Sequence, residues 1–86
     1  MADYKVTFAR SARRELEALD RPIVARILSR IESLGQEARP PGCSKLQGEE
    51  HLWRIRIGDY RIVYSIDDRQ RIVDIVRIRH RRAAYR

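Results

Sequence analysis

A short stretch in the second half of the chain decides the fold: residues 52–66 read LWRIRIGDYRIVYSI. Apolar and charged side chains alternate in Leu52–Ile57, which predicts a strand with one apolar face and two arginines on the other. Gly58-Asp59 has the composition of a tight turn, and β-branched and aromatic residues resume in Tyr60–Ile66. The stretch therefore predicts a β-hairpin that carries guanidinium groups on one face.

Shorter patterns on either side of the hairpin predict two more strands and a second turn. The side chains of Tyr4–Ala9 alternate between apolar and polar, as in a strand with one buried face. Arg71–Ile78 is rich in isoleucine and valine and predicts a strand that extends the hairpin into a three-stranded meander. Asp67–Gln70 supplies the turn before that strand.

Two helices are predicted between the first strand and the hairpin. Apolar residues recur at helical spacing after Ser11, which is a candidate N-cap for a short helix. Asp20 with Pro22 is a second helix start, and the helical pattern continues to Gly35, where a left-handed glycine is expected to end the helix. The segment Gln36–Gly48 contains adjacent prolines followed by a glycine, so we expect a loop there.

These elements predict a single α+β domain over residues 1–86, in the order β-α-α-β-β-β. An N-terminal strand and a helical hairpin precede the three-stranded antiparallel meander, and the strands form one sheet that covers the helices. We assign Trp53, Tyr60, Tyr64 and the isoleucine and valine positions to the core. A chain of this length forms one small core and has no cofactor cleft between domains, so we expect no small-molecule cofactor.

The chain is strongly basic, and almost all of its cations are arginine. Nineteen Lys and Arg residues oppose 12 Asp and Glu for a net charge of +7, and only Lys5 and Lys45 are lysines, which leaves 17 arginines. A guanidinium keeps its charge at any ordinary pH, and its planar fork fits a phosphate. The composition therefore favours a nucleic-acid partner; the alternative is that the charge serves solubility alone.

Cysteine usage and hydropathy indicate a reducing cytoplasm. Cys43 is the single cysteine, so an internal disulfide is excluded, and no Cys/His group has the spacing of a zinc site. Residues 1–5 lack the apolar region of a signal peptide, and no run approaches the ~20 apolar residues of a membrane span. We therefore expect a cytoplasmic protein with no metal and no membrane association.

Three patterns together resemble the RelE/ParE superfamily of bacterial and archaeal toxins. They are Lys45-Leu46-x-Gly48, residues 53–64 and Arg79-His80-Arg81 before Tyr85, and the resemblance extends over essentially the whole chain. It implies a toxin of a type II toxin–antitoxin system. RelE-like members are ribosome-dependent endoribonucleases, or mRNA interferases, that cut messenger RNA in the A site, whereas ParE-like members inhibit DNA gyrase. Both are neutralised by a small antitoxin protein.

The pairing of Arg81 with Tyr85 is similar to the RelE-like branch, which implies metal-independent cleavage by the 2′-hydroxyl of the RNA. By this resemblance Arg61 stabilises the phosphate in the transition state, Arg81 contacts it and assists the leaving group, and Tyr85 stacks on or orients a base. Arg54 and Arg56 fall where some members carry a pair of lysines. The implied partners are a RelB-like antitoxin, the ribosome and messenger RNA. We expect further RNA contacts from Lys45, Arg77, Arg79, His80 and Arg82.

The arginine pair departs from the lysine pattern, and this bears on the general base. An arginine essentially cannot release its proton, so neither Arg54 nor Arg56 is a good proton acceptor. Another group such as His80 must then take the proton, or charge and geometry alone activate the nucleophile, or turnover is slow. Two other functions stay open: a ParE-like gyrase inhibitor, and a degenerate member that binds its antitoxin without cutting RNA.

Simpler structural roles are open for the same residues. Arg54 and Arg56 could be solvated charges on an open sheet face, and His80 a plain surface residue. Arg61 follows the Gly58-Asp59 turn, where an ion pair with Asp59 or Glu49 would be ordinary. The aromatic ring of Tyr85 could pack on the sheet. His51 and Cys43 have no visible relay partner, and we assign them no chemistry.

Overall fold

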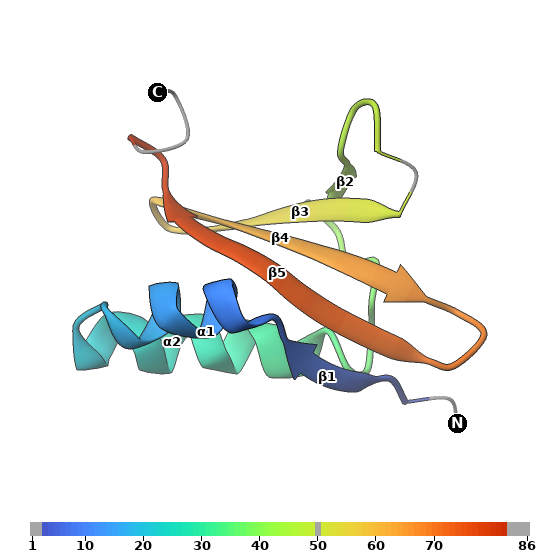
Figure 1. Ribbon diagram of the computed structural model, residues 1–86, viewed down its shortest axis with the longest axis horizontal. Helices are drawn as coiled ribbons and strands as arrows, with labels where there is room; N and C mark the ends of the chain where they lie inside the picture. The colour runs from blue at the N-terminus through green and yellow to red at the C-terminus, as the bar shows by residue number, and fades with distance from the viewer. Residues whose placement is uncertain (1–2, 50, 83–86) are drawn as a thin grey trace.

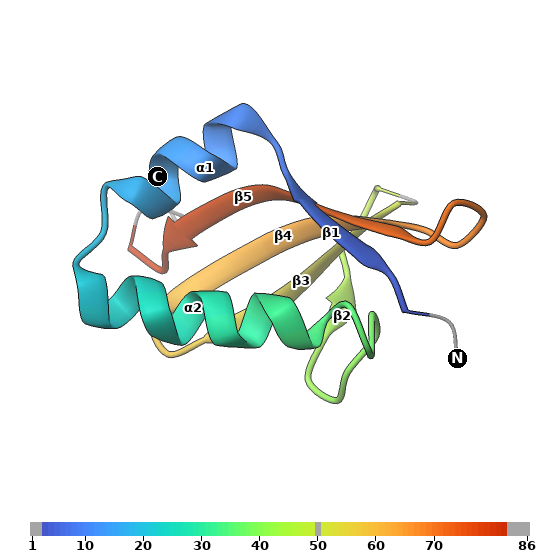
Figure 2. The ribbon, with the colours of Figure 1, turned by 90° about the horizontal axis from the view of Figure 1, so that it is seen from below.

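A five-stranded sheet carries both helices on one of its faces (Figures 1 and 2). The computed structural model describes residues 3–49 and 51–82. The chain reverses between the two helices, and we call the sheet face away from them the outer face. The elements are β1 (Lys5–Phe8), α1 (Arg10–Glu17), α2 (Arg21–Ser33), β2 (Ser44–Lys45), β3 (Leu52–Ile57), β4 (Tyr60–Asp67) and β5 (Ile72–His80).

The predicted α+β class and the predicted order of the main elements are confirmed, with two corrections to the sheet. The strand order is β1-β5-β4-β3-β2. β1 pairs with β5 in parallel, from Lys5 opposite Ile72 to Phe8 opposite Ile75, so the sheet is mixed rather than antiparallel throughout. β2 was predicted as part of a loop, but Ser44 and Lys45 pair with Arg54 and Trp53 of β3.

The β3–β4 hairpin has the bounds that the sequence predicts at its turn. Ile57 pairs with Tyr60, which leaves Gly58 and Asp59 as the connection. Gly58 has φ of 59°, a left-handed conformation that glycine adopts without steric cost. The turn fixes the register, so the alternation of apolar and charged residues places Ile55 and Ile57 in the core and the arginines on the outer face.

An irregularity in the register keeps β5 in phase with the core. Val63 of β4 pairs with Arg77, whereas the next residue, Tyr64, pairs with Ile75, so β5 contains one extra residue at this point. Ile75 and Ile78 are therefore both buried although they are three positions apart. Without the bulge, strict alternation would send one of the two isoleucines to the outer face.

Two of the three helix-boundary residues that the sequence predicts have other roles in the structure. α1 begins at Arg10 with Ala9 as its N-cap, and the Ser11 hydroxyl instead donates to the Val76 carbonyl at 3.4 Å. α2 begins after Asp20 as predicted, although the Asp20 side chain makes no capping bond. Gly35 does not take a left-handed conformation. Its lack of a side chain serves packing, because a Cβ there would lie 3.0 Å from the carbonyl oxygen of Tyr4.

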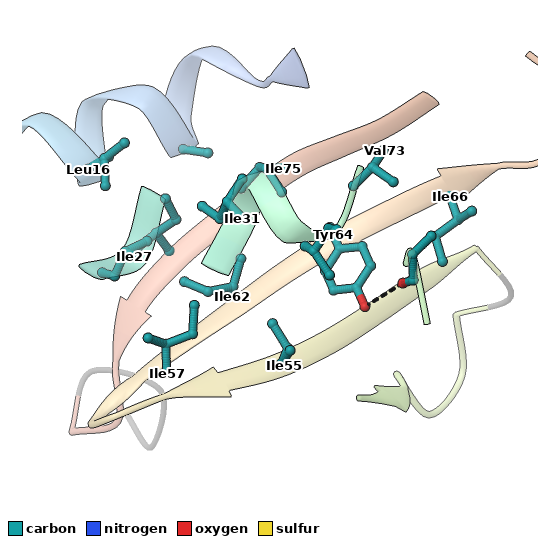
Figure 3. Packing of buried hydrophobic residues seen from close by; sticks show 14 residues of the cluster. Leu16, Ile27, Ile31, Ile55, Ile57, Ile62, Tyr64, Ile66, Val73 and Ile75 are labelled. Carbon is teal, nitrogen blue, oxygen red and sulfur yellow. Dashed lines mark hydrogen bonds between the residues drawn. The ribbon is translucent and has the colours of Figure 1, made fainter. Parts of the chain in front are cut away.

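The core lies between the helices and the inner sheet face (Figure 3). Tyr64 is fully buried at its centre, and its hydroxyl donates to the Ala38 carbonyl at 2.9 Å. Burial raises the pKa of Tyr64 well above its ordinary value, so the donor stays protonated. Trp53 and Tyr60 are half-buried against the cluster. Its buried members are Ala12, Leu16, Ile27, Ile31, Leu34, Ala38, Ile55, Ile57, Ile62, Tyr64, Ile66, Val73, Ile75 and Ile78.

The connection between α2 and β2 is fastened at several points although it has little regular structure. Arg39 forms a two-pronged contact with the carboxylate of Asp68, at 3.2 and 2.9 Å, and Tyr4 donates to the same carboxylate. The Arg39 guanidinium also lies 5.0 Å from the ring centre of Trp53. These contacts and the Tyr64 bond hold the connection in place ahead of Ser44.

Neither described helix is long and apolar enough to cross a lipid bilayer.

Candidate functional site

Arginines form a row across the three middle strands of the outer face. Arg56 of β3 is directly opposite Arg61 of β4, and Arg61 is directly opposite Arg79 of β5. In the adjacent row Val63 separates Arg54 on β3 from Arg77 on β5. The register of the sheet thus gathers side chains that lie up to 25 positions apart in the sequence, counted from Arg54 to Arg79.

Three of these arginines line one hollow of about 270 Å³, which we call the arginine hollow. Ser44 of β2 closes one side, and its hydroxyl accepts a hydrogen bond from Nε of Arg54 at 3.0 Å. This bond leaves the terminal nitrogens of Arg54 free to donate elsewhere. The residues that line the hollow are Gly42, Ser44, Arg54, Ile55, Arg56 and Arg61.

The charges in the arginine hollow are uncompensated within the described part of the chain. The salt bridges found there join Arg13 to Glu17, Arg39 to Asp68 and Arg79 to Glu15. An ion pair of Arg61 with Asp59 or Glu49, the ordinary role considered from the sequence, is not formed. The hollow therefore concentrates positive charge where a small anion such as a phosphate group can enter.

Arg79 belongs to the arginine row but is held by an acidic partner from α1. The Glu15 carboxylate accepts from Nε of Arg79 at 3.2 Å and, through its other oxygen, from the backbone N–H of Ile78 at 2.9 Å. The second bond gives an acceptor to a backbone N–H on the edge of β5, just beyond the point where β1 ends. Arg79 is thus partly neutralised, unlike the three arginines of the hollow.

The C-terminal candidates lie at the end of the sheet, around the β3–β4 turn. The backbone N–H of Arg81 donates to the Asp59 carbonyl at 2.7 Å. A second hollow of about 470 Å³, the turn hollow, is lined by Asp59, His80, Arg81 and Arg82. Among the described residues it shares no lining residue with the arginine hollow, so the structure does not bring Arg81 into one hollow with Arg56 and Arg61. Tyr85 falls outside the described residues.

His80 points away from the arginine row. Its ring meets the ring of Tyr60 edge-on, with the ring centres 5.1 Å apart, on the side of the sheet that faces the helices. Its Nδ1 accepts from the backbone N–H of Arg82 at 3.2 Å. The other predicted contacts are spread more widely: Arg77 is exposed on β5, and Lys45 lines a separate hollow with residues 46–49.

Comparison with known proteins identifies the family. A family model described as "ParE toxin of type II toxin-antitoxin system, parDE" matches residues 6–85. The chain belongs to this toxin family. It is 35% identical to Toxin RelE of Mycobacterium tuberculosis over 91 residues, which cover 96% of this chain and 87% of that relative. The RelE/ParE superfamily resemblance of the sequence is thereby confirmed.

Solved structures of related toxins have the same fold. One is the toxin–antitoxin complex RelBE2 from Mycobacterium tuberculosis, with a TM-score of 0.80, 32% identity and coverage of 91% of this chain and 98% of that chain. Another is the archaeal RelE–RelB complex from Pyrococcus horikoshii, with a TM-score of 0.81, 28% identity and coverage of 94% and 97%. The likeness extends over nearly the whole toxin.

Ser44 is the site residue of this toxin that sequence reasoning missed. It lies in the segment predicted as a loop, and only the pairing of β2 with β3 brings its hydroxyl to Arg54. A short polar strand without alternation carries no strand signal. The single hint in the sequence is the sharp turn that Pro40-Pro41-Gly42 allows just before it.

Proposed function

We propose that this toxin is a RelE-like endoribonuclease that cuts messenger RNA on the ribosome. The observation that carries the proposal is the arginine hollow, where Arg54, Arg56 and Arg61 converge without a described carboxylate partner. A site of this size and charge suits one phosphate group of a nucleic acid. Its position on an open sheet face lets an extended strand reach it, and this substrate would place the toxin in the cytoplasm.

The proposed reaction is attack of the RNA 2′-hydroxyl on the adjacent phosphorus, with departure of the 5′-oxygen. Negative charge builds on the non-bridging oxygens, and Arg61 with Arg56 would stabilise it. Arg81, at the end of the sheet, would serve the leaving group, and Tyr85 would orient a base. A shallow hollow on a small sheet gives little control over a flexible RNA, so the ribosome would supply the in-line orientation.

Among the residues that the structure describes, the arginine hollow contains no side chain that accepts a proton readily at neutral pH, since its polar residues there are three arginines and a serine. His80, the acceptor considered from the sequence, faces the helix side of the sheet. The proposal therefore attributes activation of the 2′-hydroxyl to charge and orientation. A moderate turnover is the expected consequence, because general-base catalysis typically contributes ~10²–10⁴-fold.

The proposed partner is a small RelB-like antitoxin. Toxins of the same fold are seen in complexes with RelB in the Mycobacterium tuberculosis and Pyrococcus horikoshii structures. A net charge of +7 favours an acidic partner whose association is fast and sensitive to salt. Association rates that stay constant between low and high salt would contradict an electrostatically matched partner.

The test is cell-free translation with mapping of cut sites on the message. Wild type should cut within codons, whereas Arg61→Ala and Arg81→Ala should each cut at least ~10²-fold more slowly while staying folded. Arg69→Ala is the matched control, because Arg69 is an exposed arginine in the β4–β5 turn, away from the hollow. Full toxicity of both folded site variants would contradict the assignment.

A second function, inhibition of DNA gyrase, is favoured by one observation: the matching family model is named for ParE. The same translation experiment separates the two. Toxicity with an uncut message, together with inhibited supercoiling by purified gyrase, would establish gyrase as the target. A folded, non-toxic protein that cuts nothing and still binds its antitoxin would indicate a degenerate member.

A further inference from the structure

Arg26 of α2 reaches from the helix layer to the β3–β4 turn. An ideal Cβ on Gly58 would lie 3.5 Å from Nη1, 3.6 Å from Cζ and 3.6 Å from Nη2 of Arg26. Three nearly equal distances mean that the turn faces the plane of the guanidinium rather than its edge. The guanidinium is thus laid flat over the glycine, and its in-plane donors point away from the turn.

Arg26 has no described partner for those donors. It is exposed, and it takes part in none of the salt bridges or side-chain hydrogen bonds found among residues 3–49 and 51–82. The contact with Gly58 limits its rotamers before any ligand arrives, so less conformational entropy is lost when it binds one. These are the properties of a preorganised anion contact.

Arg26 adds a further cation to those of the arginine hollow and the turn hollow. Gly58 is two residues beyond Arg56 along the chain, roughly 7 Å at the rise of a strand. The turn hollow, with Arg81 and Arg82, lies at the same turn because the backbone of Arg81 is bonded to Asp59. Cations therefore follow one another from the outer face, past the end of the sheet, to the helix layer.

We propose that Arg26 contacts the backbone phosphate of an RNA strand that leaves the arginine hollow and passes around the Gly58-Asp59 turn. A single phosphate group fills one hollow and cannot reach cations on both sides of the sheet end, whereas a strand with one phosphate per nucleotide can. The inference rests on the proposed RNA substrate and adds a second, non-catalytic contact to it. An acidic protein segment is the competing occupant, and the experiment separates the two.

The test is fluorescence anisotropy with 2′-O-methyl oligouridylate, which lacks the attacking hydroxyl and stays intact. In low salt, Arg26→Ala should bind a decanucleotide about fivefold more weakly and lower the slope of log affinity against log salt by ~0.7, the release expected for one contact to a single strand. Binding of a mononucleotide, whose single phosphate fills the arginine hollow, should be unchanged. Alanine is the best helix former, so α2 is not weakened.

Arg30→Ala is the matched control, because it removes the same charge one helical turn further along α2. An equal loss in both variants would overturn the inference, since only net charge would then matter. An unchanged decanucleotide affinity in Arg26→Ala would overturn it too, and a weakened antitoxin complex in that case would assign the surface to the protein partner. The mapping of cut sites in the wild type does not depend on Arg26. If the wild type cuts messages but Arg26→Ala binds RNA normally, only the Arg26 contact is contradicted; if the wild type cuts no message, the proposed function itself is contradicted.

Discussion

Arg56 and Arg61 are direct cross-strand partners on the outer face of the sheet. Like charges at opposed positions destabilise a sheet, and here no described carboxylate separates them. The fold tolerates this repulsion because the buried isoleucines of the same two strands hold the hairpin together from the other face. A pair that opposes folding at the mouth of a hollow fits a functional role better than a structural one.

Replacing Arg56 with threonine should stabilise the folded protein and at the same time slow message cleavage. Threonine suits a strand and removes the repulsion with Arg61, so we expect the free energy of unfolding to rise by about 0.5 kcal/mol. Message cleavage should fall by at least ~10²-fold. Urea unfolding and single-turnover cleavage measure the two effects. Arg54→Thr is the control: Arg54 faces Val63 on β4, so its removal relieves no repulsion and loses the Ser44 bond.

Ser44 should matter through Arg54 alone. Ser44→Ala removes the acceptor of the Arg54 Nε bond, which frees the guanidinium to rotate, and we expect cleavage to slow by about fivefold, the equivalent of one modest hydrogen bond. Ser44→Thr keeps a hydroxyl at the same position and should restore most of the rate. A double-mutant cycle checks this dependence. If Ser44→Ala slows cleavage by the same factor in an Arg54→Ala background as in the wild type, the two residues act independently.

Glu15 should contribute to stability through both of its oxygens. Glu15→Ala leaves the Ile78 N–H without an acceptor and frees Arg79, so we expect a loss of about 1–2 kcal/mol in the free energy of unfolding. Glu15→Gln retains an acceptor for Ile78 and loses only the charge, and its loss should be smaller. Equal losses in the two variants, measured by urea unfolding, would show that the ion pair with Arg79 dominates.

Asp68 should make stability depend on acid pH. Hydrogen bonds from Arg39 and then Tyr4 lower its pKa from 3.8 to about 2. Because the folded value lies below the unfolded one, the unfolded state binds the proton first as pH falls. The contribution is therefore complete above about pH 4 and is lost between there and pH 2. Asp68→Asn should flatten this part of the stability curve, and Tyr4→Phe should flatten it partly. A curve identical to wild type in Asp68→Asn would refute the assignment.

The arginine pair can be tested against lysine. If the site lacks a base, Arg54→Lys with Arg56→Lys should raise the cleavage rate, most of all at higher pH, where a lysine among cations is partly neutral. If the arginines clamp the phosphate, the lost forks should slow cleavage at every pH. Single-turnover cleavage of programmed ribosomes from about pH 6 to 9 decides between them. The geometry of the hollow, with Arg54 held by Ser44, favours the uniform loss.

Features that depend on neighbouring residues could be predicted from the sequence. The bounds of β3, Leu52–Ile57, follow from strict alternation up to a glycine turn, and α2 begins after Asp20 as expected. Single-residue boundaries failed where tertiary packing decided them. Gly35 is required by the carbonyl of Tyr4, which is 31 positions earlier, and no local pattern contains that contact.

The candidate site could likewise be predicted only where its residues are close in the sequence. The arginines of β3 and β4 could be placed on one face because one hairpin carries them, and Arg61 with Arg56 follows from the turn register. The capture of Arg79 by Glu15 joins residues 64 positions apart, and the role of Ser44 depends on a strand of two residues. The face of His80 was not predicted either, although the regular alternation beyond the bulge places it on the face opposite to that of Arg79.

The parallel pairing of β1 with β5 has a consequence for how the toxin folds during synthesis. Lys5 meets Ile72, so the sheet closes only after all the intervening residues are in place, and such long-range pairing slows folding. β5 also lies between β1 and β4, so a nascent chain that stops before it leaves β1 unpartnered and the edge of β4 open. The sheet that carries the arginine hollow is therefore completed late during synthesis, once β5 has been made.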